Sequence, residues 1–572
     1  MKPIVCGIDL GTTNSVIAFL RGGYPEAIPV EEGTAILPSV VSFEPENGGH
    51  WVGQRARNRR AAFPEATITS IKRLMGKETT VTAGQRSFSP EEISSYILKY
   101  LAERAFEQLG ERITQVVITV PAYFDDAQRR ATIRAGELAG LEVVRIVNEP
   151  TAAALVYDHV LSETGAESPY VLVYDLGGGT FDVSILEIKG EIKEVLASSG
   201  DTSLGGDDFD ERLKDYFLEE LRQQAGREDL EEDVGLRVRL LDMAERAKIA
   251  LSDRPYVKVH EVAVTMLDGQ PLNLDLELSR ELFQSLTADL IERTMAKVTE
   301  VLQEAHLDAE DIGKLILVGG VTRMPAVHEA LSELFDQSVE HSVDPDLCVA
   351  LGAAIQGGLI TGDSVGQILL DVTAHSLGLK TIDEVHPETG DADYFSTIIR
   401  RNTRIPVSRA EVYRTLLEQQ SGVKVEVFQG ESVSCSENTP VGSFFFPLEP
   451  APAHSPVVVE FAYDREGLVR ICADQKGYEN RKEVTLDIRN RKVEDAPASE
   501  SAETPVNYVA EKARRLAVDE RLAESVKCEI RRVMVSYEEA IRSGEDENRV
   551  DNLEDQLLEL MEQAEEELES RE

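Results

Sequence analysis

The 572-residue sequence has few cysteines, and none of the spacings that cysteine-based sites require. Its five cysteines lie far apart and no two of them form a CxxC pair; they are Cys6, Cys348, Cys435, Cys472 and Cys528. The pattern argues against both a zinc site and a disulfide-stapled domain. We therefore expect five free thiols in a reducing compartment.

The sequence also lacks a long apolar run. No stretch approaches the length that a membrane-spanning helix needs. The N-terminus reaches Asp9 after only a handful of apolar residues, which is too short for a secretory signal with its cleavage site. We therefore expect a cytoplasmic protein with no membrane partner.

Basic residues are scarce relative to acidic ones. The 59 lysines and arginines stand against 104 aspartates and glutamates, giving a formal net charge of −45. Such a chain repels phosphates unless basic patches compensate, so we expect no nucleic-acid partner. Part of the excess lies in runs such as Glu565–Glu567, which fit a solvated helix face. The length and the 42% hydrophobic content predict a globular protein of two to four domains.

Three styles of sequence follow one another along the chain. β-branched runs such as Val116–Val120 alternate first with helical patterns such as Asp125–Leu138, which is typical of an α/β domain. Short alternating segments such as Val423–Val427 then indicate an antiparallel β-sandwich. The expected parts are an α/β domain (1–362), an interdomain linker (363–371), a β-sandwich (372–490), a polar linker (491–505) and a helical tail (506–572).

The first linker carries an unusual apolar triplet, Ile368–Leu370. Exposed linkers rarely hold three large apolar residues together, because such patches are usually buried. Two interpretations stay open from the pattern alone. The triplet is the first strand of the β domain, or it is a segment that docks in one state and is released in another.

An internal repeat carries the strongest chemical signal. Ile4–Thr13 and Val171–Thr180 each contain a strand that ends at an aspartate, Asp9 or Asp175, followed by a glycine-rich turn and a returning apolar strand. Successive N–H groups in such turns bind phosphate oxygens, and carboxylates suit magnesium. Two facing copies would hold a triphosphate, whereas two unrelated hairpins would not. Neither copy fits a P-loop. The residues of these two turns are Gly11, Thr12, Thr13, Gly177, Gly178, Gly179 and Thr180, and the family resemblance described below implies that they bind the nucleotide phosphates.

Three further features are candidates for the same site. A glycine turn, Gly319–Gly320, follows an apolar strand and suits close approach to an adenosine. Glu149, at the end of another strand, is placed to orient an attacking water. Lys72 is a candidate for neutralising phosphate charge. On its own, each is more typical of an ordinary surface residue.

Ordered motifs give these features a common context: Asp9–Thr13, Val120–Phe124, Asn148–Ala154, Asp175–Asp182, Leu204–Gly206, Val318–Gly320, Leu369–Thr373, Arg401–Pro406 and Phe428–Glu431. Together they resemble the 70-kDa heat-shock chaperone family of the DnaK type. The resemblance covers both principal domains.

The resemblance implies a multidomain fold: an actin-like (ribonuclease H-like, two-lobed) ATPase domain, an antiparallel β-sandwich and an α-helical lid. It implies ATP, Mg²⁺ and K⁺ as cofactors. Asp9, Glu149 and Asp175 would hold magnesium, partly through water, and Asp182 would hold potassium. Catalysis would rest on Lys72, Glu149, Asp175, Thr180 and Asp9. Further nucleotide contacts would come from Gly205, Gly206, Glu245, Lys248, Ser252, Gly319, Gly320, Arg323 and Asp346, with the apolar Ile249 facing the base.

The resemblance also implies a client site and a route of control. Extended apolar segments of unfolded proteins would be bound by Leu379, Ile382, Tyr413, Leu416, Val423 and Val425. Leu416, where a small or aromatic residue is usual, and the hydroxyl of Tyr413 put the client preference in question. Nucleotide state would be sensed by Pro121 and Arg129 and transmitted by the docking linker residues Leu369, Leu370 and Asp371. Arg145, Asn148 and Thr151 resemble a patch that meets a J-domain co-chaperone.

The C-terminal helices depart from the family pattern. They are shorter than the usual lid, and the loops around Glu245 are also short, so docking of a nucleotide-exchange factor stays open. Two other functions share parts of this sequence. A sugar or metabolite kinase on the same fold would have the hairpins but no sandwich. A non-hydrolysing exchange factor or holdase would not need Lys72, Glu149 and Asp175.

Overall fold

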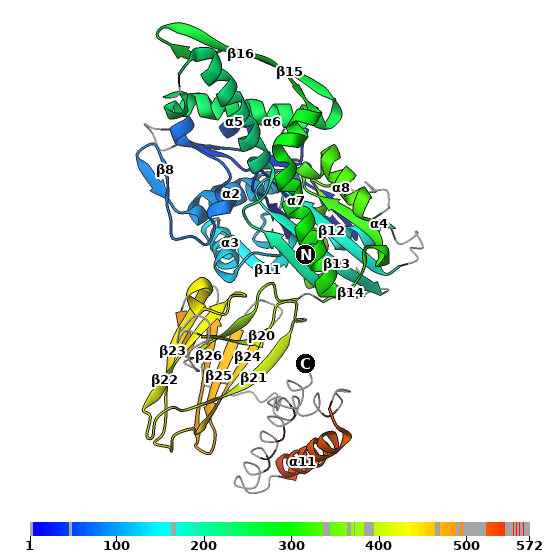
Figure 1. The fold of residues 1–572 in the computed structure, drawn as a ribbon, viewed down its shortest axis with the longest axis vertical. Helices are drawn as coiled ribbons and strands as arrows, with labels where there is room; N and C mark the ends of the chain where they lie inside the picture. Colours follow the sequence, from blue (N-terminus) through cyan, green and yellow to red (C-terminus); the bar gives the residue numbers. More distant parts are fainter. Residues whose placement is uncertain are drawn as a thin grey trace. The chain divides into compact units, whose positions relative to one another are not determined.

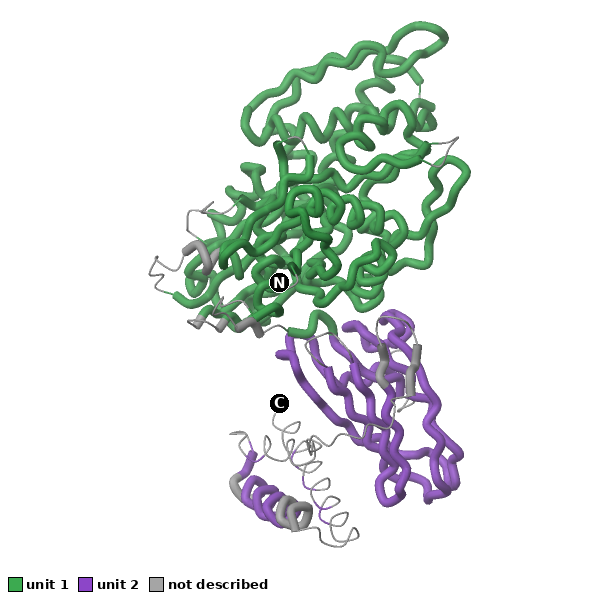
Figure 2. Tube along the Cα trace, turned by 180° about the vertical axis from the view of Figure 1, so that it is seen from behind, with its two compact units in different colours: residues 1–375 green, residues 376–572 purple. Residues whose placement is uncertain are grey.

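The computed structural model describes residues 4–31, 33–44, 49–161, 168–189, 192–227, 229–335, 344–362, 368–370, 372–381, 394–463, 469–487, 492–495, 517, 522–543, 553, 556, 560 and 564. The chain forms two compact units, Met1–His375 and Ser376–Glu572 (Figure 2). The division falls a few residues after the end of the predicted interdomain linker. Among the helices within the described ranges, none is long and apolar enough to cross a membrane.

The elements of the chain are shown in Figure 1, and the first unit contains two sheets whose strand pairings follow the same plan. In each sheet, three consecutive strands are antiparallel, and a further strand pairs in parallel with the first of the three. The first sheet has the order β11-β10-β1-β2-β3, with β4 paired to β2: β1 (Val5–Leu10), β2 (Asn14–Arg21), β3 (Tyr24–Ala27), β4 (Ile36–Pro38), β10 (Gln115–Val120) and β11 (Glu142–Asn148). The second has the order β17-β12-β13-β14-β18: β12 (Tyr170–Leu176), β13 (Phe181–Lys189), β14 (Ile192–Asp201), β17 (Ile312–Val318) and β18 (Ile368–Leu370). The repeat that the sequence shows in the two hairpins therefore extends to the whole sheets. The predicted α/β character of this part of the chain is confirmed.

Two helices, α4 (Glu149–Leu161) and α9 (Cys348–Ile360), pack against each other and against strands of both sheets. α9 is buried over most of its length because it is apolar on all sides. Glycines allow the close contacts: a Cβ on Gly352 would lie 1.8 Å from the carbonyl oxygen of Ala152. This packing fixes the two hairpins relative to each other.

Smaller elements extend each half of the unit. The half built on the first sheet adds β5 (Val41–Phe43), β6 (His50–Val52), α1 (Gln54–Arg59), β7 (Thr67–Ile68), a 3-10 helix (Ile71–Leu74), β8 (Val81–Ala83), β9 (Arg86–Phe88), α2 (Pro90–Leu109) and α3 (Asp126–Leu138). The other adds α5 (Gly206–Ala225), α6 (Val234–Asp253), β15 (Tyr256–Leu267), β16 (Gln270–Ser279), α7 (Arg280–Ala305), a 3-10 helix (Gly320–Arg323) and α8 (Pro325–Phe335).

The apolar triplet Ile368–Leu370 is strand β18. It pairs in parallel with β14, from Ile192↔Ile368 to Glu194↔Leu370. The interpretation as the first strand of the β domain is therefore wrong, because these residues complete a sheet of the first unit. Asp371 lies outside the described residues.

The second unit is a β-sandwich with a helical segment after it. One sheet has the order β20-β19-β22-β23 and the other β21-β24-β25-β26-β27; buried residues of both form one core. The elements are β19 (Leu377–Thr381), β20 (Tyr394–Ile399), β21 (Val407–Arg414), β22 (Gly422–Gln429), β23 (Thr439–Pro447), β24 (Pro456–Tyr463), β25 (Val469–Gln475), β26 (Asn480–Asp487), β27 (Lys492–Asp495) and α11 (Glu524–Ser543). β27 lies inside the segment that was predicted to be a polar linker. It pairs with β26 and forms a charged edge strand of the sheet. Its composition alone is that of a linker, so the strand was not predicted.

Candidate functional site

The turns of the two repeated hairpins touch each other. A Cβ on Gly178 would lie 1.7 Å from Thr13 Oγ1, and one on Gly179 would lie 2.5 Å from the Thr12 side chain. No residue other than glycine fits there without movement of the facing threonine. The two hairpins are therefore not unrelated, because the backbone of the second turn packs against side chains of the first turn.

Other glycines bring further backbone against the second turn. A Cβ on Gly205 would lie 2.5 Å from Gly179 N, and one on Gly319, whose φ is +82°, 2.4 Å from the carbonyl oxygen of Leu176. Gly206 N donates to Gly177 O at 2.9 Å and Asp207 N donates to Gly178 O at 2.8 Å, which ties the start of α5 to this turn. Three glycine segments far apart in sequence therefore meet at one point.

A cavity opens between the two turns. The sequence-predicted residues on its wall are Asp9, Gly11, Thr12, Thr13, Lys72, Glu149, Asp175, Gly177, Gly178, Thr180, Gly319, Gly320 and Asp346. They come from the ends of strands in both sheets, from the start of α4, from the turn before α9 and from the 3-10 helices. Asn14, Val318, Pro345 and Val349 complete the wall.

The cavity contains more negative than positive charge. Lys72 Nζ lies 2.6 Å from Glu149 Oε1, and both side chains are buried. Burial alone would lower the pKa of Lys72, but the charges of Glu149 and Asp9 outweigh it and raise that pKa. Burial, and then the charge of Glu149, raise the pKa of Asp9 and of Asp182 to about 7 and that of Asp175 well above its usual value. One lysine thus lies among the carboxyl groups of Asp9, Glu149 and Asp175 on the cavity wall, with Asp182 just behind it.

This donor set suits a hard cation, because added positive charge would stabilise the ionised carboxylates. Thr13 Oγ1 is buried without a hydrogen-bond partner, as expected of an atom that binds a ligand. In the part of the chain that the structure describes, no three Asp, Glu, His or Cys side chains are grouped closely enough to hold an ion by themselves. A magnesium ion here would therefore keep water or phosphate ligands.

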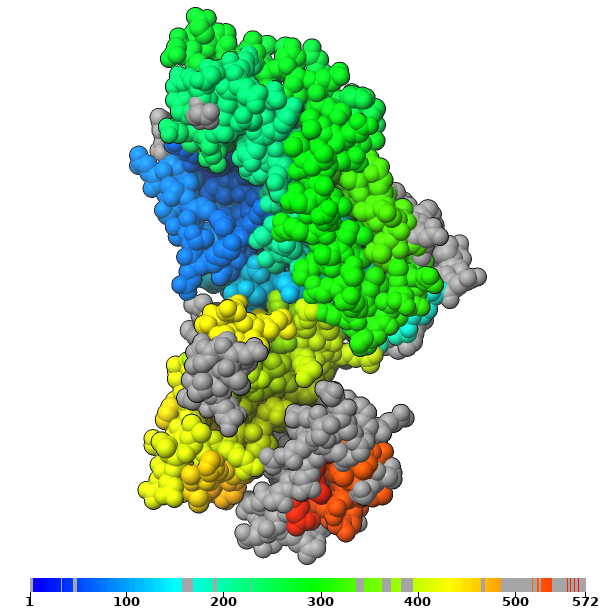
Figure 3. Space-filling view, viewed as in Figure 1, coloured from blue at the N-terminus to red at the C-terminus, as the bar shows by residue number. Residues whose placement is uncertain are grey.

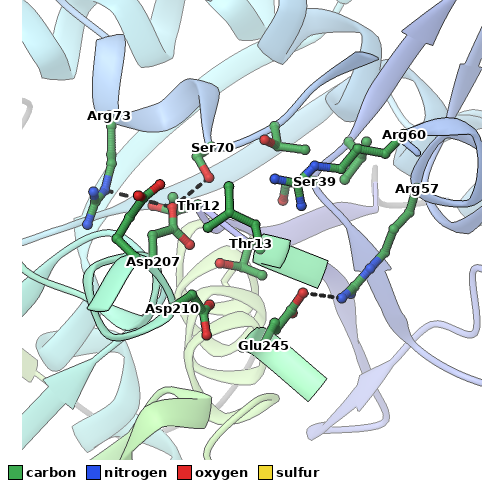
Figure 4. A pocket seen from close by; sticks show the side chains of 14 residues that line it. Thr12, Thr13, Ser39, Arg57, Arg60, Ser70, Arg73, Asp207, Asp210 and Glu245 are labelled. Carbon is green, nitrogen blue, oxygen red and sulfur yellow. Dashed lines mark hydrogen bonds and ion pairs between the residues drawn. The ribbon is translucent and has the colours of Figure 1, made fainter. Parts of the chain in front are cut away.

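A second cavity adjoins the first and shares Thr12 and Thr13 with it (Figure 4). Apart from Thr12 and Thr13, its two walls come from residues 39–73 on one side and residues 207–245 on the other, and these parts of the chain border each other in Figure 3 as blue and green surface. The side-chain contacts that join these walls include Arg57 Nη2 to Glu245 Oε2 at 2.5 Å, Arg60 Nη1 to Asp242 Oδ1 at 3.0 Å, Ser70 Oγ to Asp207 Oδ2 at 2.6 Å, and Arg73 to Asp208.

The other residues expected around adenosine lie near these cavities but do not line the first one. Lys248 Nζ is bound to Asp210 Oδ2 at 2.7 Å and to Gly206 O at 3.0 Å. Ser252 Oγ donates to Lys248 O at 3.4 Å, and Ile249 is exposed. Arg323 contacts Asp346 at 2.8 Å and Asp344 at 2.9 Å. In this conformation the predicted adenosine contacts Glu245 and Lys248 are therefore both engaged by protein side chains.

Of the predicted switch residues, Arg129 lies in the first turn of α3 and contacts the turn that follows Pro121. Arg129 donates to Phe124 O at 3.1 Å, to Ala122 O at 3.0 Å and to Asn148 Oδ1 at 2.7 Å. The guanidinium thereby ties the turn after Pro121 to the strand end that precedes Glu149. Asn148 and Thr151 are buried, and Arg145 is half-buried. A J-domain patch made of all three would need a rearrangement here.

The predicted client-binding residues differ in exposure. Leu379 and Val425 are buried in the core of the sandwich, with Val423 and Tyr413 packed against that core. The Tyr413 hydroxyl lies 3.0 Å from Ser396 Oγ, and burial raises the pKa of Tyr413. Leu416 is 57% exposed and the next residue, Leu417, 67%. Ile382 lies outside the described residues.

Sequence reasoning missed several residues that the fold brings to this region. No recognised motif contains Arg57, Arg60 and Arg73. The concentration of arginines in this short stretch of an acidic chain could have indicated a site there. Tyr123 lies in a motif that was recognised, yet only its neighbour Pro121 was assigned a role. His375 had no signal at all.

The comparison with known families decides the identity. The family model described as Hsp70 protein matches residues 5–87 and 78–572, nearly the whole chain. The chain belongs to the Hsp70 family. The resemblance read from the motifs is thereby confirmed, and the chain is a chaperone of the Hsp70 type. Hsp70 proteins in general bind and hydrolyse ATP with Mg²⁺ and act on unfolded clients together with J-domain partners.

Proposed function

We propose that this Hsp70 is an ATP-dependent chaperone in which hydrolysis within residues 4–375 controls the binding and release of extended apolar segments by the β-sandwich. One observation carries the proposal: the two phosphate-type hairpins interlock beside a buried Lys72–Glu149 pair. An intact pair of this kind is what a hydrolysing site needs and a passive holdase does not.

The residues of the first cavity would divide the work as follows. Backbone N–H groups of both turns, with Thr13 and Thr180, would bind the phosphates. Asp9, Glu149 and Asp175 would hold magnesium partly through water, and the ion would neutralise phosphate charge. Lys72 would hold the transferring phosphoryl group, and Glu149 would orient the attacking water. Asp182 is proposed as a potassium ligand. Adenosine would lie between Gly319–Arg323 and the α6 residues Glu245, Lys248 and Ser252, which requires the contacts of Glu245 and Lys248 to open.

The linker would couple this site to the client. β18 is paired with β14, so release of the linker would expose a strand edge in the first unit and free the sandwich. The proposed client residues are Leu379, Ile382, Tyr413, Leu416, Val423 and Val425. We also propose a J-domain co-chaperone as partner and, from the five free cysteines, a cytoplasmic location.

The test is ATP turnover by the full-length protein. We expect slow basal phosphate release that rises when an extended apolar peptide and a J-domain protein are added. Transfer of phosphate to a sugar or another small molecule, without stimulation by peptide, would favour the kinase. Nucleotide binding without phosphate release would favour the holdase.

A further inference from the structure

The attachment of the linker to the first unit continues beyond β18. Val372 is 5% exposed and belongs to the core that includes Val5 and Val117. Thr373 is also buried. The chain thus stays packed on the first unit past the predicted end of the linker, and His375 is the last residue of that unit.

His375 makes two contacts with one residue, Tyr123. Its Nε2 lies 3.1 Å from the Tyr123 carbonyl oxygen. Because that oxygen only accepts, Nε2 carries the hydrogen, and this holds for the charged imidazole as well as for one neutral tautomer. The two rings also meet edge to face, with centroids 4.6 Å apart and an interplanar angle of 63°.

Tyr123 is in turn tied to the candidate cation site. Its N–H donates to Asp182 Oδ1 at 2.9 Å. Asp182 is paired in the β12–β13 hairpin with Asp175, the carboxylate that lines the first cavity. Lys297 of α7 lies over the Tyr123 ring at 6.0 Å. The backbone of one residue therefore connects a buried carboxylate of the phosphate hairpin to the end of the linker.

We propose that His375 is a positioning residue for interdomain coupling. It fixes the end of the linker to Tyr123, and the Tyr123 backbone is bound to Asp182. A movement of Asp182 would therefore displace Tyr123 and, through His375, the linker. The proposal rests on the proposed function, since coupling matters only if hydrolysis controls the sandwich. His375 lies outside both cavities, so its removal leaves the hydrolytic residues untouched.

The test uses the full-length protein and three variants at this position. H375A removes both contacts. H375Q keeps a side-chain N–H donor at a similar reach, and H375F keeps the ring pair. H260A is the matched control, because His260 is a half-exposed histidine on β15 in another part of the same unit.

The first readout is hydrogen–deuterium exchange of the backbone amides in 368–375, without nucleotide or peptide. In H375A we expect exchange to be faster by about 5- to 30-fold, the factor expected from losing one or two modest contacts. H375Q and H375F should each recover part of the protection, and H260A should match the wild type. Exchange in H375A that equals the wild type would overturn the proposal, as would a complete lack of recovery in both H375Q and H375F.

The second readout is the stimulation of ATP turnover by peptide. H375A should keep the basal rate within about twofold and lose most of the stimulation, with partial return in H375Q or H375F. Full stimulation in H375A would overturn the proposal. A wild type that peptide does not stimulate would contradict the proposed function instead, and the exchange experiment would still test the anchor.

Discussion

Lys72 and Glu149 form a buried ion pair, with 2.6 Å between Nζ and Oε1, at the point where the two halves of the first unit meet. They are 77 residues apart in sequence, on a 3-10 helix and at the start of α4. Neither is paired by local structure, so their contact depends on how the 3-10 helix and the end of β11 come together within the half built on the first sheet. Buried pairs of this kind add little net stability, but losing one partner is costly.

Replacing Lys72 or Glu149 alone should therefore lower both stability and turnover. We expect K72M and E149Q each to reduce ATP hydrolysis by about 10²- to 10³-fold, the usual effect of removing one charge-stabilising group. K72M should also reduce unfolding free energy by about 3–5 kcal/mol, because Glu149 is left buried without its partner. The double variant K72M/E149Q removes both charges, so it should regain stability but not activity. Urea unfolding followed by the fluorescence of Trp51, the single tryptophan, reports on this unit. Wild-type turnover in either single variant would contradict the assigned roles.

The contact between the hairpins predicts a sharp difference between adjacent glycines. In G178A the new methyl group would overlap Thr13, whereas in G177A its nearest neighbour, Thr180 O, would be at an ordinary 3.7 Å. We expect G178A to weaken nucleotide binding by at least about tenfold and G177A to bind within about threefold of the wild type. Calorimetric titration with ATP and Mg²⁺ measures both. Equal affinities in the two variants would mean that the turns separate when nucleotide binds.

The pairing of β18 with β14 predicts a variant that separates binding from coupling. L369D/L370D should leave nucleotide affinity within about twofold but abolish stimulation of turnover by peptide, because charged residues favour the undocked linker. The matched control is D363N/S364A, two changes in the polar stretch before the triplet. If stimulation survives in L369D/L370D, the strand is structural and another route couples the two units.

Asp210 predicts a pH dependence of stability. Burial raises its pKa to about 7, although Lys248 lies 2.7 Å away and acts in the opposite sense. In the unfolded chain its pKa returns to about 3.9. The folded state then holds the proton more tightly, so the contribution of Asp210 is complete below pH 4 and is lost as the pH rises to 7. The decline is up to about 1.4 kcal/mol per pH unit.

The experiment compares the wild type with D210N by urea unfolding between pH 5 and pH 7.5. D210N lacks the titrating group, so the free-energy difference between the two proteins should change steadily over this range in favour of the variant. A difference that is constant with pH would show that Asp210 stays ionised beside Lys248.

Several features could be read from the sequence because they are local. A strand that ends in aspartate and glycine specifies a turn through the conformations that glycine allows, and two copies of it indicate a duplicated unit. Strand β10 differs by one residue from its predicted start at Val116, and helix α3 begins one residue after its cap, Asp125. The family could be read as well, because its motifs occur in a fixed order along the chain.

Other features had no local signal. The triplet Ile368–Leu370 fitted a strand of either domain, and only its pairing with β14 assigned it to the first unit. β27 has the composition of a linker, and only the open edge of β26 made it a strand. In both segments the structure depends on the strand with which the segment pairs. For Ile368–Leu370 that strand is remote in sequence, and for β27 it is the neighbouring strand left unpaired when the sheet assembles.

By itself, then, the sequence determined the chemistry of this Hsp70: which residue types stand at the ends of its repeated hairpins, and how they can bind phosphate and a cation. Which side chains meet depends on the tertiary structure. It brought Lys72 to Glu149, interlocked Gly178 with Thr13, and joined His375 to Tyr123 across 252 residues. The reason is physical: turn and strand preferences act over a few residues, whereas contacts between distant residues depend on how whole sheets and helices pack.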